Sequence, residues 1–167
     1  MIGDSTLETT TQQSTNHNAL LAIGVGGGVA GTLDLLQACI LFGWDIPLSI
    51  AGGLLGRQAV HGGAGTYILG VLLHFFIACS AAATYYAASR KLTFLTEHPL
   101  VCGLFFGAAV QEVMNLVVLP LSAVPKRPFV LGMALLILVV HMVFVGLPIS
   151  LAVRRWAPLR PPAPAAP

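Results

Sequence analysis

The stretch Thr66–Ser89, TYILGVLLHFFIACSAAATYYAAS, decides the fold class of this chain. It contains no Asp, Glu, Lys or Arg, and as an α-helix it would be about 36 Å long at 1.5 Å per residue. That length exceeds the ~30 Å hydrocarbon core of a bilayer, so the stretch predicts a transmembrane helix.

Three other stretches have the same apolar character, and together with the first they occupy most of the chain. The four predicted spans are residues 19–44, 66–89, 99–122 and 128–153. Backbone groups in lipid must be paired within a helix or a closed barrel, and these runs lack the alternation of barrel strands. We therefore predict an all-α integral membrane bundle of four transmembrane helices within residues 19–157.

The composition supports this assignment and excludes several classes of protein. Of the 167 residues, 56% are hydrophobic and 8% are charged, whereas a soluble domain has about 25% charged residues. The formal charge of +2 includes no dense basic run, so we expect a lipid bilayer and no nucleic acid as partner. Cys39, Cys79 and Cys102 are odd in number and widely spaced, which argues against a disulfide framework.

Both ends of the chain have a different composition from the spans. Residues 1–18 are rich in Thr, Gln, Ser and Asn and lack the Lys or Arg of a signal peptide, so they predict a disordered polar tail. Residues 158–167 are rich in Pro and Ala and predict a disordered, extended tail.

The connector between the first two spans, residues 45–65, is apolar and rich in glycine. It predicts an interfacial helix or, alternatively, a re-entrant segment buried against the bundle. In the second case Arg57 would be a candidate counter-ion for an intramembrane carboxylate.

The basic residues predict the orientation. Five Lys or Arg flank the side of the termini and three flank the other side: Arg90, Lys91, Arg154, Arg155 and Arg160 against Arg57, Lys126 and Arg127. Because short cytoplasmic segments carry the excess of Lys and Arg, we expect both termini in the cytoplasm of a cell whose plasma membrane the chain spans.

Small residues recur along two of the spans. Gly24, Gly27 and Gly31 in the first span, and Gly103 and Gly107 in the third, are spaced three or four residues apart. Glycine at this spacing lets another helix backbone approach closely. We therefore predict that these five residues pack helices together, and we expect a homo-oligomer or a complex with another membrane protein.

Each span also carries an ionisable side chain, which costs at least a few kcal/mol at bilayer depth and therefore needs a partner or a function. Glu112 is the strongest candidate for a functional residue among these, because two amides, Gln111 and Asn115, lie within one turn of it. The candidates for a proton or solute pathway are Asp34, His74, Gln111, Glu112, Asn115 and His141.

Three interpretations of these polar residues remain open. A carboxylate beside an imidazole can share a proton, which favours a transport-type or proton-linked role. The same residues can act as interhelical hydrogen-bonding glue in a structural or accessory subunit. A metal site is the third; no HExxH or CxxC spacing supports it, so the metal stays unknown and no cofactor is predicted.

The sequence does not decide whether the protein is an enzyme, but it favours a protein without enzymatic activity. The serines inside the apolar runs lack any nucleophile signature, so no catalytic residue is predicted. Two prolines, Pro120 and Pro148, lie inside the third and fourth spans and predict kinks, because proline frees the carbonyl four residues earlier.

Three short motifs resemble the YagU-type family of uncharacterised bacterial inner-membrane proteins. They are LHFFIA at residues 73–78, GLFFGA at residues 103–108 and LPL at residues 119–121. The resemblance covers about half of the chain, and His74, Gln111 and His141 coincide with its pattern, whereas the segment around Asp34 does not. It implies a multi-pass protein of the bacterial inner membrane and carries no established activity.

Overall fold

The computed structural model describes residues 3–123 and 130–157, with side chains from Asn16 onward. Every element in these ranges is helical. In order they are α1 (Gly3–Phe42), α2 (Ile46–Leu55), the 3-10 turn η1 (Arg57–His61), α3 (Ala64–Ser89), α4 (Phe94–Glu97), α5 (Pro99–Val113), the π-helical turn η2 (Met114–Val118), α6 (Leu119–Leu121), α7 (Leu131–Val140), the π-helical turn η3 (His141–Gly146) and α8 (Leu147–Trp156).

Four continuous helical segments are long and apolar enough to cross a membrane. They are Asn16–Phe42, Ala64–Ser89, Pro99–Leu121 and Leu131–Trp156. The predicted span ends agree with these bounds to within three residues. The predicted fold class, an all-helical bundle of four membrane-spanning helices, is therefore confirmed over the described residues.

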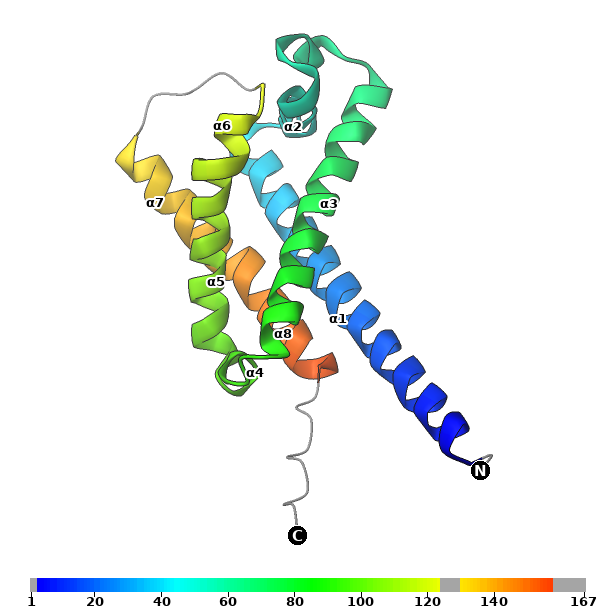
Figure 1. Ribbon diagram of the computed structural model, residues 1–167. Helices are drawn as coiled ribbons and strands as arrows, with labels where there is room; N and C mark the ends of the chain where they lie inside the picture. Colours follow the sequence, from blue (N-terminus) through cyan, green and yellow to red (C-terminus); the bar gives the residue numbers. More distant parts are fainter. Residues whose placement is uncertain (1–2, 124–129, 158–167) are drawn as a thin grey trace.

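The four spans alternate in direction (Figure 1). α1 and α5 run toward the end of the bundle that carries α2 and α6, and α3 and α8 run back toward the end that carries α4. Along their lengths α1 packs against α3 and α8, and α5 packs against η3 and α8. The start of α1 and the end of α8 therefore lie at the same end of the molecule.

The polar segment at the N-terminus differs from the prediction. α1 begins at Gly3, so residues 3–18, which the composition predicted to be disordered, form a helix that continues into the first span. Extending an existing helix requires no new nucleus, which removes the main obstacle to helix formation in a polar segment. Figure 1 shows this extension projecting beyond the other helices. The predicted tail at 158–167 lies outside the described residues, as do Lys126 and Arg127.

The connector between the first two spans is a helix packed across the end of α3. The buried face of α2 includes Pro47, and Pro47 lies so close to Gly70 of α3 that a side chain at Gly70 would overlap its carbonyl. At its other end α2 is held to the segment after α6, because the Ala123 amide donates to the Gly53 carbonyl at 2.9 Å. Arg57, which follows α2, is exposed.

Small side chains fill the space between the helices, and large ones face outward. Ala22, Ala30 and Ala82 are fully buried, whereas Phe76 and Phe105 are 71% and 72% exposed. Lipid chains are as apolar as these outward side chains, so helices in a membrane associate through close packing of small residues. The burial pattern is thus that of a bundle surrounded by lipid.

Four of the five predicted packing glycines lie at close contacts between helices. A Cβ at Gly27 would lie 2.7 Å from the Cys79 Cα, and one at Gly31 would lie 2.9 Å from the Phe75 ring. Gly107 meets the backbone of η3 and Gly103 meets Gly146 and Ser150 in the same way, whereas nothing lies within 4 Å of a Cβ at Gly24. These seams join α1 to α3 and α5 to η3 and α8 within one chain.

Each predicted proline kink is accompanied by a π-helical turn. Pro120 follows η2 and Pro148 follows η3. In both turns the residue before the proline donates its amide five residues back, Leu119 to the Met114 carbonyl and Leu147 to the Met142 carbonyl. Because proline cannot donate to the carbonyl four residues earlier, the wider turn redistributes the hydrogen bonds around the missing donor.

The glycine contacts predict a sharp difference between two alanine substitutions in α1. Gly27→Ala should lower the free energy of unfolding by about 1–3 kcal/mol, because its Cβ would overlap the α3 backbone. Gly24→Ala should be neutral or stabilising by up to about 1 kcal/mol, because its Cβ meets nothing and alanine favours helix. Denaturant unfolding of both variants in detergent micelles measures the difference; equal effects would contradict the packing described.

Candidate functional site

A cavity of about 200 Å³ lies between α1, α2, α3, α5 and the two π-helical turns. Its walls are mostly apolar, and Ile46 and Ile50 of α2 form part of them. Three wall residues are ionisable: Asp34 from α1, His74 from α3 and His141 from η3. The fold thus gathers three of the predicted candidates around one space.

These three residues lie at a similar depth along the bundle. At 1.5 Å per residue, Asp34 lies about 12 Å before the end of its span at Phe42, and His74 and His141 each lie about 15 Å after the start of theirs. All of these distances are measured from the end of the bundle that carries α2 and α6. The cavity therefore lies near the middle of a ~30 Å hydrocarbon layer.

Asp34 and His74 form the central pair of the cavity. The His74 Nε2 and Asp34 Oδ2 are 3.9 Å apart, and the two side chains are only 15% and 16% exposed. The same Nε2 lies 2.9 Å from the Gly31 carbonyl oxygen. Because a carbonyl can only accept, Nε2 carries a hydrogen and donates it to Gly31, which leaves Nδ1 of His74 available for a second proton.

The glycine seam explains how this pair arises. Without a Cβ at Gly31, the side chains of Phe75 and Ala78 on α3 lie directly against α1. The neighbouring imidazole of His74 can then reach the Gly31 carbonyl. Asp34 follows Gly31 by three residues and so lies on the same face of α1, one turn away.

This arrangement places a carboxylate beside an imidazole. When Nδ1 takes up a second proton, the imidazolium faces the Asp34 carboxylate at 3.9 Å. A carboxylate in this position would serve as the counter-ion of a charged histidine at bilayer depth.

His141 occupies a more structural position on the same cavity wall. Its Nδ1 donates to the Ile137 carbonyl at 3.0 Å, one turn earlier in its own helix. Its backbone carbonyl packs against Gly107 of α5. In the described part of the chain no three His, Cys, Asp or Glu side chains are arranged to hold a metal ion.

The amide and acid cluster of α5 divides between two faces of that helix. Gln111 is buried, in line with Gly103 and Gly107 against η3, whereas Glu112 and Asn115 are exposed on the outside of the bundle. Val110 and Met114 line the cavity from the same helix. Glu112 lies two residues from each of them, which at 3.6 residues per turn points it to the opposite side. Glu112 therefore does not join the cavity.

The alternative partner for an intramembrane carboxylate, Arg57, also lies elsewhere. It is exposed in η1, and the ion pair that the structure gives Asp34 is with His74. The sequence pattern did not indicate that the Gly31 carbonyl accepts from His74 or that α2 forms a wall of the cavity. The position of Asp34 on the glycine stripe was the available signal for the first.

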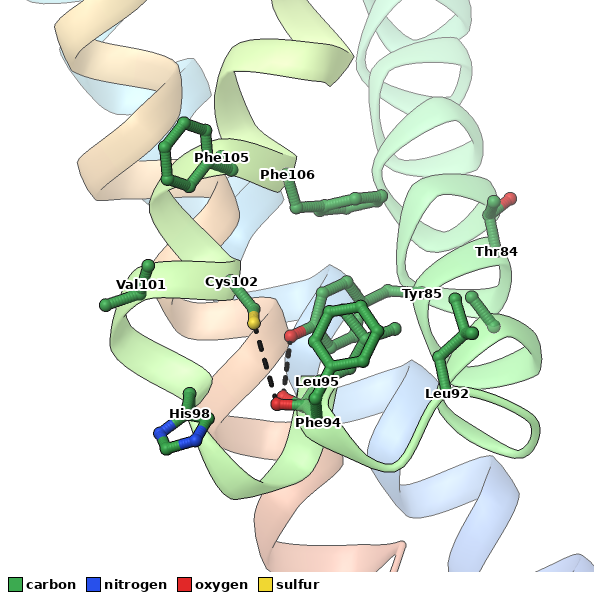
Figure 2. A pocket seen from close by; sticks show the side chains of 11 residues that line it. Thr84, Tyr85, Leu92, Phe94, Leu95, His98, Val101, Cys102, Phe105 and Phe106 are labelled. Atoms are coloured by element: carbon green, nitrogen blue, oxygen red, sulfur yellow. Dashed lines mark hydrogen bonds between the residues drawn. The ribbon is translucent and has the colours of Figure 1, made fainter.

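A larger groove, of about 680 Å³, lies between the end of α3, α4 and the start of α5 (Figure 2). Two of its polar groups have local partners: the Tyr85 hydroxyl donates to the Leu95 carbonyl at 2.9 Å, and the Cys102 Sγ lies 3.6 Å from the Phe94 carbonyl. Phe106 packs edge-on against the Tyr85 ring. The groove is larger than the inner cavity, but the predicted candidates Asp34, His74 and His141 line the cavity.

The hydrogen bonds of the two histidines predict opposite neutral tautomers. His74 should carry its hydrogen on Nε2, and His141 should carry it on Nδ1, because each of these atoms donates to a backbone carbonyl. ¹⁵N NMR of histidine-labelled protein distinguishes protonated from unprotonated ring nitrogens. His74→Gln and His141→Gln assign the signals, and exposed His61 is the control. A neutral His74 protonated on Nδ1 would contradict the described geometry.

Comparison with known proteins adds no relative to this description. No family model, curated protein or solved structure matches the chain. What the cavity can do is therefore argued from its own residues.

Proposed function

We propose that the chain is a small multi-pass protein of a bacterial inner membrane with a proton-linked, transport-type role, in which Asp34 and His74 take up and release the proton. The observation that carries the proposal is the 3.9 Å pair inside a cavity near the middle of the bilayer. Carboxylate and imidazole side chains are costly at this depth, and in membrane proteins they mark proton relays and ion pathways.

The size and lining of the cavity favour a proton or small ion over an organic solute. A space of about 200 Å³ corresponds to about six water molecules, each of which occupies about 30 Å³ in the liquid. Its apolar walls offer few polar groups besides Asp34, His74 and His141. A larger polar solute would leave most of its hydrogen bonds unpaired there.

A bacterial inner membrane and cytoplasmic termini are parts of the same proposal. The resemblance of spans two to four to YagU-type proteins supports the first. The second is supported by Arg90 and Lys91 after α3 and by Arg154 and Arg155 in the last turn of α8, which lie at one end of the bundle.

The proton proposal predicts flux through reconstituted protein. In proteoliposomes that contain a pH-sensitive dye, a potassium diffusion potential should drive proton uptake faster than in protein-free liposomes. Asp34→Asn should reduce this flux at least tenfold, because the histidine loses its counter-ion, and His74→Ala should do the same. The matched controls, Asp45→Asn and His61→Ala, change the same chemical groups at exposed positions outside the cavity and should leave the flux unchanged.

A second function, that of a structural or accessory subunit, is favoured by one specific observation. Both intramembrane histidines donate to backbone carbonyls, and His74 thereby links α3 to α1. If folded wild-type protein carries no flux while His74→Ala lowers the thermal unfolding midpoint, the polar residues serve as interhelical glue and the transport proposal fails.

The proposed orientation gives a separate prediction. A reporter fused at the C-terminus should be active as a cytoplasmic reporter, and the same reporter inserted at Lys126 should lie on the opposite side of the membrane. The expectation follows from the alternating direction of the four spans and from the distribution of Lys and Arg. Reporters on the same side would contradict the four-span topology.

A further inference from the structure

An outward stripe on the third span repeats with the spacing of a helix seam. Its members follow one another at steps of four, three, four, three and four residues: Val101, Phe105, Ala108, Glu112, Asn115 and Leu119. All are exposed except Ala108, which is half-buried. Over the α-helical part, from Val101 to Glu112, alternating steps of three and four keep side chains on one face toward a partner helix in a left-handed pair. Asn115 lies in the π-helical turn η2 and Leu119 follows it, and both are exposed as well.

The members of the stripe are mostly exposed, although Val101 and Phe105 also line the groove between α3, α4 and α5. Figure 2 shows Val101 and Phe105 pointing away from α3, whereas Phe106 and Cys102 of the same helix point toward Tyr85. The glycine seam of this span is occupied from another side, because Gly103 and Gly107 contact η3 and α8. An interface with another molecule therefore uses a different face of the span from the glycines.

Two members of the stripe are poorly suited to contact with lipid. Glu112 lies about 20 Å from the start of its span at Pro99, near the middle of the hydrocarbon layer. Its carboxyl and the Asn115 carboxamide are both exposed there. Polar groups at this depth are costly in lipid and drive helices to associate when a partner can satisfy them.

We propose that this stripe is the interface with a second copy of the chain, in which Glu112 and Asn115 of each copy hydrogen-bond to those of the other. A two-fold axis along the membrane normal brings equal depths together and makes every contact reciprocal. Glu112 and Asn115 differ in height by only about 4.5 Å, so either can reach the other across the axis.

The chemistry of the stripe selects a second copy over an unrelated helix. The carboxamide both donates and accepts, so it complements a carboxyl and also another carboxamide. The stripe itself contains no Lys or Arg that would call for an acidic partner. A polar side chain within an otherwise apolar seam also fixes the register of the two helices.

The first test measures self-association of the full chain in liposomes. Copies labelled with donor and acceptor dyes should show energy transfer that persists as lipid is added. Glu112→Leu combined with Asn115→Leu should weaken association at least tenfold, because both polar contacts are lost. The matched control, Thr32→Leu combined with Ser80→Leu, removes exposed polar groups from the other spans and should leave association unchanged.

The second test does not depend on how the polar variants fold. Phe105→Cys should give a disulfide-linked dimer on mild oxidation in the membrane, whereas Phe76→Cys, equally exposed but on α3, should give no more than the parent chain with its three native cysteines. A monomeric wild type, or equal cross-linking at both positions, would overturn the proposal and would show that lipid or a different protein covers Glu112. Neither readout depends on proton flux, so this proposal and the proposed function fail separately.

Discussion

The contact of the α1 backbone with α3 at Gly27 and Gly31 is the constraint on which the candidate site depends. With hydrogen in place of a side chain at these positions, the two helices meet at the distances that larger residues would prevent. Only this approach lets His74 of one helix donate to a carbonyl of the other, and it places Asp34 beside the same imidazole. The glycines that let the two helices pack closely therefore also bring the carboxyl of Asp34 and the imidazole of His74 together in the cavity.

The lipid-facing surface shows how the chain treats polar groups outside that cavity. Thr32, Ser80 and Thr84 are exposed, and each hydroxyl donates to the carbonyl four residues earlier in its own helix. Such bonds satisfy a short side chain without a partner helix. An ionised Glu112 carboxylate can only accept hydrogen bonds, so it cannot donate to a carbonyl of its own helix as these hydroxyls do. Its outward position therefore points to a partner outside the chain.

The number and the bounds of the four spans were predictable from sequence, because each span depends only on the length and hydropathy of its own segment. A run such as residues 66–89 must cross the bilayer whatever its neighbours are. The composition of the candidate site was predictable only in part, because the depth of a residue follows from counting but the rotation of its helix does not. Glu112 and His141 have similar depths, yet a difference of two positions from Val110 turns Glu112 outward. The sequence pattern gave least support to Asp34, yet Asp34 lies beside His74 in the cavity because His74 donates to the carbonyl of Gly31, one turn away.

The geometry of the central pair bears on the choice between a proton site and structural glue. A purely structural role requires a hydrogen bond between the helices, and the Nε2 of His74 already makes one to the Gly31 carbonyl. The Asp34 oxygen at 3.9 Å is beyond hydrogen-bond distance, so it adds charge complementarity but no bond. A neutral, hydrogen-bonded His74 would gain little from a costly carboxyl beside it. A histidine that becomes positively charged would gain a counter-ion, and this asymmetry is the physical reason to favour the proton-linked role.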